Sequence, residues 1–260
     1  MQERHLNRRL YFDELAETTE KYFISYLNEF IPISSEIKVL EIGCGEGGNL
    51  LSFAKRGCAV AGIDISKEKI DAGIEIFKEM GIQANLICSD FFDVNDLDEK
   101  YDIILIHDVI EHITNKESFL NEAKKFLNQG GIFFVAFPAW QMPFGGHQQA
   151  CHNKYLSKMP FIHLLPARIY KWILSKAKEP IPVIDELLDI KKCRVPIEKF
   201  RKLAKKCHFE IRDEQFYFIN PHYEIKFNLK PRKLTPLIGK IPYIRNFFTT
   251  SCFYILQNKN

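Results

Sequence analysis

The sequence predicts an α/β fold, with a doubly wound, mostly parallel sheet of seven strands and helices on both faces. The order of the apolar segments along the chain predicts it. Between residues 34 and 137, short apolar runs alternate with amphipathic segments of helical period. Such alternation is typical of parallel strands joined by crossover helices. The length of 260 residues suits one large domain, or one domain with a sizeable insertion.

The elements are expected in a regular order. An amphipathic helix is predicted from Tyr11 to Phe30, followed by Pro32 and a serine pair that end it. The predicted strands are Lys38–Ile42, Ala59–Ile63, Ala84–Cys88, Ile103–His107, Ile132–Phe137, Phe209–Phe218 and Cys252–Leu256. The predicted helices between them lie near Asn49–Arg56, Lys67–Met80, Lys116–Leu127 and Pro196–Lys206.

Two segments break this alternation. Residues 138–195 contain no strand pattern and are rich in Pro, Phe and basic residues, and residues 221–248 form a second irregular, basic stretch. Ligands of open α/β sheets bind outside the carboxyl ends of the strands. We therefore expect the insertion after the fifth strand to cover the substrate.

Composition favours a soluble protein of the cytoplasm. The N-terminus is polar, which argues against a signal peptide, and the apolar stretch from Ile132 to Trp140 is too short to span a membrane. The seven cysteines are scattered and include no C-x-x-C pair. This pattern fits reduced thiols better than disulfides or a zinc site.

The charges are unevenly distributed. Residues 1–137 contain 14 Lys and Arg against 24 Asp and Glu, whereas residues 138–260 contain 22 against 9. A strongly basic second half indicates contact with something anionic. The alternative is that the basic residues only solvate a half that is rich in aromatic side chains.

A glycine-rich loop follows the first strand. Gly43, Cys44 and Gly45 stand where a chain turns tightly and brings its N–H groups against a ligand, and Asp64 ends the second strand, where it can hold a ribose. NAD and S-adenosylmethionine both fit this pattern. Glu41 favours the second, because an acid two residues before the first glycine repels phosphate and attracts a sulfonium ligand with an amino group.

Together these segments resemble the successive motifs of the class I S-adenosylmethionine-dependent methyltransferases, which have a Rossmann-like fold. The segments are 39–48, 62–66, 89–91, 101–113 and 130–134. The resemblance implies that Glu41, Gly43, Cys44 and Gly45 surround the methionine part of the cofactor. It also implies that Asp64 holds the ribose, that Ile65, Asp90 and Phe91 contact the adenine, and that the backbone near His107 lines the sulfonium. The chain then divides into a helical cap (1–33), a cofactor-binding core (34–137), a lid (138–195) and a segment completing the sheet (196–260), all within one domain (1–260).

An acid–histidine motif follows the fourth strand. If residues 108–112 form a helical turn, Asp108, Glu111 and His112 share one face and are able to bind a divalent cation such as Mg²⁺ or Zn²⁺. The motif resembles that of ubiquinone-pathway O-methyltransferases and of methyltransferases acting on small-RNA 3′ ends, with Asp in place of Glu at 108. The resemblance implies a further histidine ligand, His147 or, as second choice, His152. The alternatives are direct base catalysis by His112 and a purely structural role.

The segment Pro166–Lys178 has a helical period. Its basic face carries Arg168, Lys171, Ser175 and Lys178, and its adjoining face carries Leu165, Ile169, Trp172 and Ile173. A basic amphipathic helix with Trp is typical of a peripheral contact with an anionic membrane, here at the inner face. An ordinary substrate lid is the alternative.

The expected function is O-methylation of a small-molecule, glycan or lipid-linked acceptor with anionic character. A ubiquinone-like phenolic lipid is a related alternative. RNA modification is disfavoured because no nucleic-acid-binding module is recognisable, and a catalytically silent cofactor-binding scaffold is a further alternative. The sequence predicts no oligomeric state.

Overall fold

A computed structural model describes residues 7–94, 97 and 99–259 of the chain. Its strands are β1 (Lys38–Ile42), β2 (Ala59–Asp64), β3 (Asn85–Cys88), β4 (Tyr101–His107), β5 (Leu127–Phe137), β6 (Phe209–Ile219), β7 (Arg232–Lys233) and β8 (Ser251–Asn258). They form one sheet in the order β3-β2-β1-β4-β5-β8-β6-β7. β1 to β5 are parallel, and β8 pairs antiparallel with both β5 and β6.

The predicted α/β class with a mostly parallel sheet is therefore confirmed. The prediction of seven strands is wrong by one, because the two-residue strand β7 pairs with β6 at the edge of the sheet. So short a strand, in a segment of Pro and Lys, has too few residues for an alternating pattern to show.

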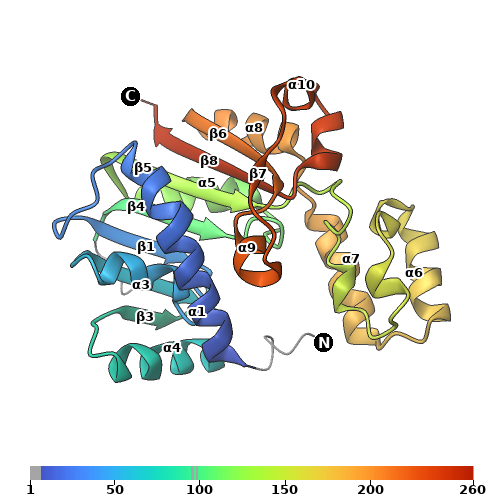
Figure 1. The fold of residues 1–260 in the computed structure, drawn as a ribbon, viewed down its shortest axis with the longest axis horizontal. Helices are drawn as coiled ribbons and strands as arrows, with labels where there is room; N and C mark the ends of the chain where they lie inside the picture. Colours follow the sequence, from blue (N-terminus) through green and yellow to red (C-terminus); the bar gives the residue numbers. More distant parts are fainter. Residues whose placement is uncertain (1–6, 95–96, 98, 260) are drawn as a thin grey trace.

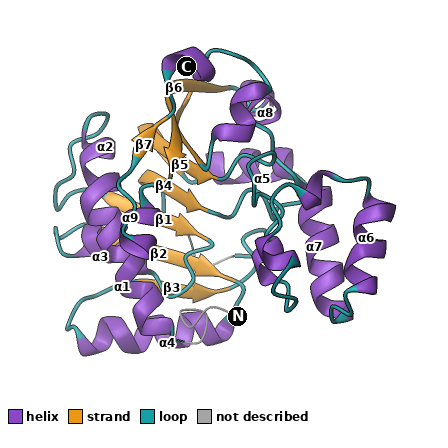
Figure 2. Cartoon of the chain, turned by 45° about the vertical axis from the view of Figure 1, so that its right-hand side comes forward, coloured by secondary structure: helices purple, strands orange, loops and turns teal. Residues whose placement is uncertain are grey.

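Helices cover both faces of the sheet (Figure 2). One hydrophobic cluster joins the sheet to α1 (Arg8–Thr18), α3 (Gly48–Ala54) and α4 (Lys67–Glu79). Another joins the opposite face to α5 (Lys116–Lys125) and α8 (Ile197–Lys206). Burial on both faces explains the continuous apolar run at the end of β5, since central strands of parallel sheets are covered on each side.

The strand order reverses between β1 and β4. The next strand along the chain after β1 lies on one side of it and β4 lies on the other, so their following loops diverge at the carboxyl ends. Such a switch point leaves a crevice for a ligand. It places the glycine loop after β1 beside the acid–histidine motif after β4.

The N-terminal helix is not uniform. α1 continues into a π-helical turn, η2 (Thr19–Phe23), and then into α2 (Ile24–Asn28), where a single helix was predicted from Tyr11 to Phe30. Within the turn, the Thr19 hydroxyl donates to Asn49 Oδ1 at 2.8 Å in a buried position. A π turn re-aims the side chains that follow it.

The first insertion forms a separate helical unit after β5. Three short 3-10 turns, η3 (Gln148–Ala150), η4 (Leu156–Lys158) and η5 (Ile162–Leu164), precede α6 (Ala167–Lys176) and α7 (Ile181–Cys193). α6 and α7 lie to the right of the sheet in Figure 1 and share a small hydrophobic cluster of their own. No helix was predicted at α7 from the sequence. Pro180 precedes the helix and Pro182 lies in its first turn, where Pro is tolerated.

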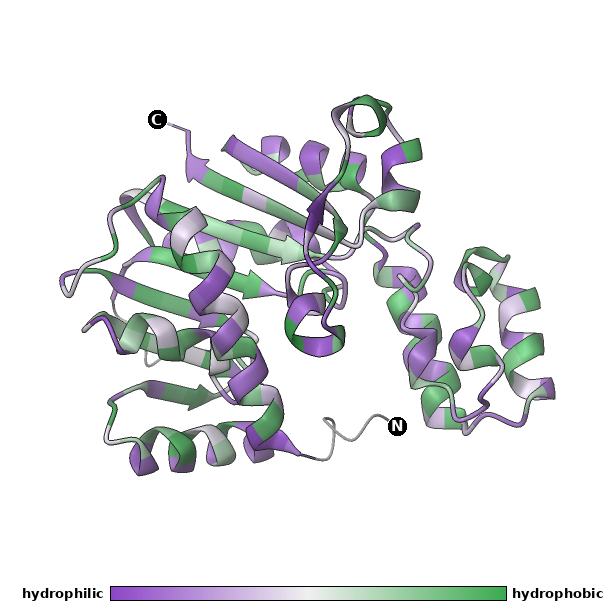
Figure 3. Ribbon diagram, in the orientation of Figure 1, coloured by the Kyte–Doolittle hydropathy of each residue, from purple (hydrophilic) through white to green (hydrophobic). Residues whose placement is uncertain are grey.

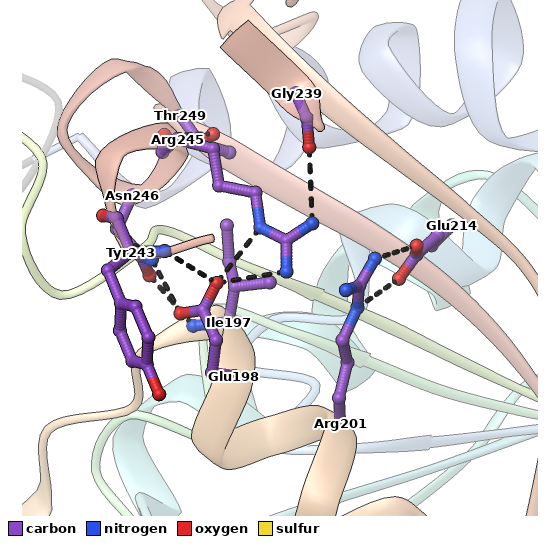
Figure 4. A network of polar contacts seen from close by, with 9 residues as sticks. All are labelled: Ile197, Glu198, Arg201, Glu214, Gly239, Tyr243, Arg245, Asn246 and Thr249. Carbon is purple, nitrogen blue, oxygen red and sulfur yellow. Dashed lines mark hydrogen bonds and ion pairs between the residues drawn. The ribbon is translucent and has the colours of Figure 1, made fainter. Parts of the chain in front are cut away.

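The second insertion contains α9 (His222–Phe227), β7, α10 (Pro236–Gly239) and the 3-10 turn η6 (Ile244–Phe248), so it is more ordered than the predicted irregular stretch. Glu198 at the start of α8 joins the second insertion to that helix (Figure 4). The Glu198 carboxylate accepts hydrogen bonds from the Tyr243 backbone, from Arg245 Nε at 3.0 Å and from Asn246 Nδ2 at 2.7 Å. Within the described residues, no helix has the length and apolar character that crossing a bilayer requires.

Candidate active site

The glycine loop after β1 packs too closely for side chains. Gly43 has a φ of +74°, and a Cβ there would lie 2.4 Å from Val109 Cγ2 in the loop after β4. Gly45 has a φ of +57°, and its N–H donates to Asp64 Oδ2 at 2.9 Å. Left-handed backbone and close approach both require glycine here. The loop therefore keeps an open backbone surface at the switch point.

Glu41 is buried beneath this loop. Its side chain is at the end of β1, and its Oε1 accepts a hydrogen bond of 2.6 Å from Asn49 Nδ2. The other oxygen, Oε2, is buried and has no partner among the described residues. Burial raises the pKa of Glu41 to about 8. The hydrogen bond from Asn49 lowers this pKa and the charge of Asp64 raises it, but both effects are smaller than that of burial. An unpartnered buried carboxylate oxygen favours a cationic ligand.

Asp64 links the two loops at the ends of β1 and β2. Its carboxylate accepts from Gly45 N and, at 2.8 Å, from Ser66 N. A carboxylate has about four acceptor positions, so it retains capacity for ribose hydroxyls. Ile65 is 76% exposed beside it, in keeping with a surface on which a flat ring can lie.

The segment after β3 differs in detail from expectation. Asp90 is exposed, and its Oδ1 accepts from the Phe92 backbone in a turn. Phe91 is buried in the core, with its ring 5.3 Å from that of Phe119, whereas Phe92 is half exposed. That Asp90 and Phe91 contact adenine stays a prediction. Cys44 is likewise buried, so what it offers to a ligand is its backbone.

Three side chains of the acid–histidine motif and the first insertion come together. Ligand atoms of Glu111, His112 and His147 all lie within 4.8 Å of one another. His147 Nε2 is 4.0 Å from Glu111 Oε1, and the two imidazole rings meet edge to face at 5.1 Å. Both carboxylate oxygens of Glu111 are buried without a hydrogen-bond partner in the part of the chain that is described.

Burial controls the protonation of this cluster. It raises the pKa of Glu111 well above its usual value, and the charge of Asp108 adds to this. It lowers the pKa of His112, and it lowers the pKa of His147 to about 4. Two imidazoles whose neutral form is favoured, and a carboxyl group without a hydrogen-bond partner among the described residues, are groups that can bind a cation or a proton.

Asp108 does not join this cluster. The expected helical turn over residues 108–112 is not formed, because Asp108 has a left-handed φ of +54° and only residues 110–112 make a turn. Its Oδ2 lies 3.8 Å from His107 Nε2 instead. His152 is also elsewhere, with its backbone N–H donating to Glu179 Oε2 at 2.9 Å.

Two further elements, α1 and α9, lie close enough to Asp108 to feel its charge. The sequence motifs did not reveal them. The charge of Asp108 adds to burial in raising the pKa of Tyr11 in α1, and in raising that of Tyr223 in α9 to about 12. His222 in α9 lies edge to face with Tyr11 and with His107, each at 6.5 Å. The only sequence signal was the aromatic character of both segments, which core packing explains equally well.

Comparison with known proteins gives a family. The profile described as "Methyltransferase domain" matches residues 33–178. The ubiquinone biosynthesis O-methyltransferase of Rhizobium leguminosarum bv. trifolii is 34% identical over 102 residues, which are 38% of this chain and 40% of that protein. The protein of the same description from Bartonella tribocorum is 27% identical over 180 residues, covering 66% of this chain and 72% of its own.

These matches have limits of length and of similarity. In the first two curated relatives, the matched region spans 40% and 53% of their own length. Among solved structures, the plantazolicin methyltransferase BpumL in complex with S-adenosylhomocysteine aligns with a TM-score of 0.55 at 16% identity, covering 97% of this chain and 87% of that one. The structural likeness at this identity concerns the fold.

Proposed function

Since the chain belongs to the methyltransferase domain family of class I S-adenosylmethionine-dependent enzymes, we propose that it methylates a hydroxyl group, with Glu111, His112 and His147 as its reactive cluster. The observation that carries this proposal is that both buried oxygens of Glu111 lack a hydrogen-bond partner among the described residues and lie close to two histidines. The curated relatives that match are likewise named ubiquinone biosynthesis O-methyltransferases.

The glycine loop after β1 and its neighbours support the use of S-adenosylmethionine. When bound, S-adenosylmethionine supplies a methyl group on a positively charged sulfur. Glu41 Oε2 suits its amino group because this buried oxygen has no partner among the described residues. Asp64 suits ribose hydroxyls, and the bare backbone of Gly43 and Gly45 leaves room for the methionine part.

The cluster of Glu111, His112 and His147 supports a hydroxyl group as the acceptor. A hydroxyl acceptor must lose its proton as the new C–O bond forms. Burial lowers the pKa of both imidazoles and so favours their neutral forms, in which His112 and His147 each have a lone pair that can take up a proton or hold a cation. When bound, Mg²⁺ or Zn²⁺ supplies a Lewis acid that lowers the pKa of a hydroxyl group. Glu111, His112 and His147 would hold it.

Removal of the metal tests this assignment. We expect turnover to stop in a chelator and to return when Zn²⁺ or Mg²⁺ is added back. His147→Ala should abolish turnover and leave the affinity for S-adenosylhomocysteine unchanged, because His147 is not part of the cofactor loop. Full turnover with chelator would exclude the metal and leave His112 as the direct base. Full turnover in His147→Ala would exclude the cluster as proposed.

The outer face of the first insertion suits an acceptor carried on an anionic surface. α6 buries Tyr170 and Leu174, so Ile169 and Trp172 are exposed, at 46% and 60%. Arg168 and Lys171 are exposed beside them. Figure 3 shows apolar and polar positions interleaved along this helix. Exposed Trp between cations favours an anionic lipid surface, and each cation near such a surface contributes about 1 kcal/mol.

Vesicle binding tests the acceptor proposal. Of the two tryptophans, Trp140 is buried and Trp172 is exposed, so a blue shift of the fluorescence on binding reports Trp172. We expect binding to phosphatidylglycerol vesicles that weakens with salt and is absent for phosphatidylcholine. In Lys171→Glu the binding should weaken by more than about fivefold, because the charge reversal costs more than about 1 kcal/mol. Lys192→Glu, on an exposed position of α7, is the matched control. Equal binding to both lipids would exclude an anionic surface.

A further inference from the structure

A buried histidine of the first insertion lies directly behind the loop that carries His147. His163 belongs to η5 and is fully buried, with its ring edge to face against Trp140 at 4.7 Å. Its Nε2 lies 2.8 Å from the Trp140 carbonyl oxygen. Because a carbonyl oxygen only accepts, Nε2 carries the proton and donates it. Burial also keeps the ring neutral, since it lowers the pKa of His163 to about 4.

The loop backbone rests on this histidine. A Cβ at Gly146 would lie 2.1 Å from the Cβ of His163, and one at Gly145 would lie 2.4 Å from the Trp140 carbonyl oxygen. The next residue, His147, has a left-handed φ of +55°. Residues other than glycine adopt this conformation only where the surrounding structure fixes it.

Further hydrogen bonds join the loop to both sides of the insertion. Lys191 in α7 donates from Nζ to the His163 carbonyl oxygen at 2.6 Å and lies over the Trp140 ring at 5.6 Å. The buried Gln148 donates from Nε2 to Pro143 O at 2.8 Å and to Met159 O at 3.2 Å. Loop 140–148, residues 156–165 and α7 are thus fastened to one another at several points.

We propose that His163 is a positioning residue: through its bond to Trp140 and its contact with Gly146, it fixes the loop that holds His147 against Glu111. This inference rests on the proposed role of the Glu111–His112–His147 cluster. It gives the first insertion a role in building the active site, in addition to the expected role of covering the substrate. Lys191 holds His163 in place from α7.

A matched pair of variants tests the proposal. His163→Gln keeps an N–H donor near the position of Nε2, whereas His163→Phe keeps an aromatic ring and removes the donor. In the full chain, we expect His163→Phe to weaken Zn²⁺ binding and turnover by about 10–100-fold, as the loss of an outer-sphere partner does, and His163→Gln to stay within about threefold of the wild type. The affinity for S-adenosylhomocysteine should not change in either variant.

A second variant and a second measurement guard against misfolding. Lys191→Met keeps the aliphatic stem and removes the donor to the His163 carbonyl group, so we expect the same losses in weaker form. The ring resonances of His147, observed by NMR, should shift in His163→Phe and match the wild type in His163→Gln. If His163→Phe keeps wild-type Zn²⁺ affinity, turnover and His147 resonances, the proposal is wrong.

Failure of the proposed function gives a different result. If the wild type binds no Zn²⁺ and His147→Ala keeps full turnover, the cluster has no role in the reaction. Even then the His147 resonances decide the positioning role: a shift confined to His163→Phe supports it, and unchanged resonances overturn it.

Discussion

At the residue scale, the proton on Glu41 links cofactor binding to pH. Burial raises the pKa of Glu41 to about 8, so the group is protonated in the ligand-free protein at neutral pH. Its folded pKa lies above its unfolded value, so the stability that this acid contributes falls as pH rises from about 4.5 to about 8. A cationic amino group near Oε2 favours the carboxylate and expels the proton.

We therefore predict that binding of S-adenosylhomocysteine releases a proton at pH 7. Its affinity should weaken below pH 8 by at most about tenfold per pH unit. Calorimetry in two buffers with different ionisation enthalpies measures the proton. Glu41→Gln, which cannot ionise, should bind more weakly and release none. Proton release that is equal in the variant would mean that another group carries it.

Most of the residues in the candidate site were predictable from the sequence. The positions of Glu41, Gly43, Gly45 and Asp64 follow from strand ends and backbone conformation, which are local. That Asp108 lies outside the cluster of Glu111, His112 and His147 was not predictable, because the left-handed φ that prevents the expected helical turn has no pattern in the sequence. Tyr11 and His222 reach the site through the packing of α1 and α9, which is not local.

At the scale of one element, α4 depends on a glycine in its interior. A Cβ at Gly73 would lie 2.5 Å from the Glu46 carbonyl oxygen in the glycine loop after β1. Alanine gains about 1 kcal/mol of helix propensity over glycine, but overpacking costs about 1–3 kcal/mol. We predict a net loss of stability for Gly73→Ala, measured by urea unfolding. In Gly239→Ala, where nothing lies within 4 Å, stability should stay the same or rise; a similar loss there would exclude the clash as the cause.

The contact between α8 and the second insertion contains a buried ion pair. Arg245 and Glu198 have side chains 4% and 13% exposed, whereas Arg201 and Glu214 of the neighbouring pair are about one-third exposed, at 31% and 29% (Figure 4). Breaking a buried pair costs about 3–5 kcal/mol, against about 0–1 kcal/mol for an exposed pair. We predict that Glu198→Ala destabilises the protein far more than Arg201→Ala does. Equal losses in thermal unfolding would contradict the difference in burial.

The regular elements of the first 137 residues were predictable because each strand and helix has its own period. The insertions were less so. α7 was not predicted, and the order of residues 140–165 comes from contacts such as those of His163 and Gly146, which have no sequence pattern.

At the scale of the whole molecule, two hydrophobic clusters hold the sheet and a smaller one holds α6 and α7. A small separate cluster opens at a lower free energy than the main core. We predict that the amides of α6 exchange hydrogen faster than those of β4 and β5. Zn²⁺ should slow exchange in residues 140–165 more than in α8. Equal protection of α6 and β5 would show that the insertion unfolds only with the whole protein.

The central claim, that the glycine loop binds the cofactor and the Glu111 cluster performs the reaction, is tested most directly by label transfer. The wild type, Asp64→Ala and Glu111→Gln are each incubated with methyl-labelled S-adenosylmethionine and a cell lysate, and their S-adenosylhomocysteine affinities are measured in parallel. We expect label in an extractable acceptor for the wild type only, with lost S-adenosylhomocysteine affinity in Asp64→Ala and retained affinity in Glu111→Gln. Wild-type transfer by Glu111→Gln would contradict it.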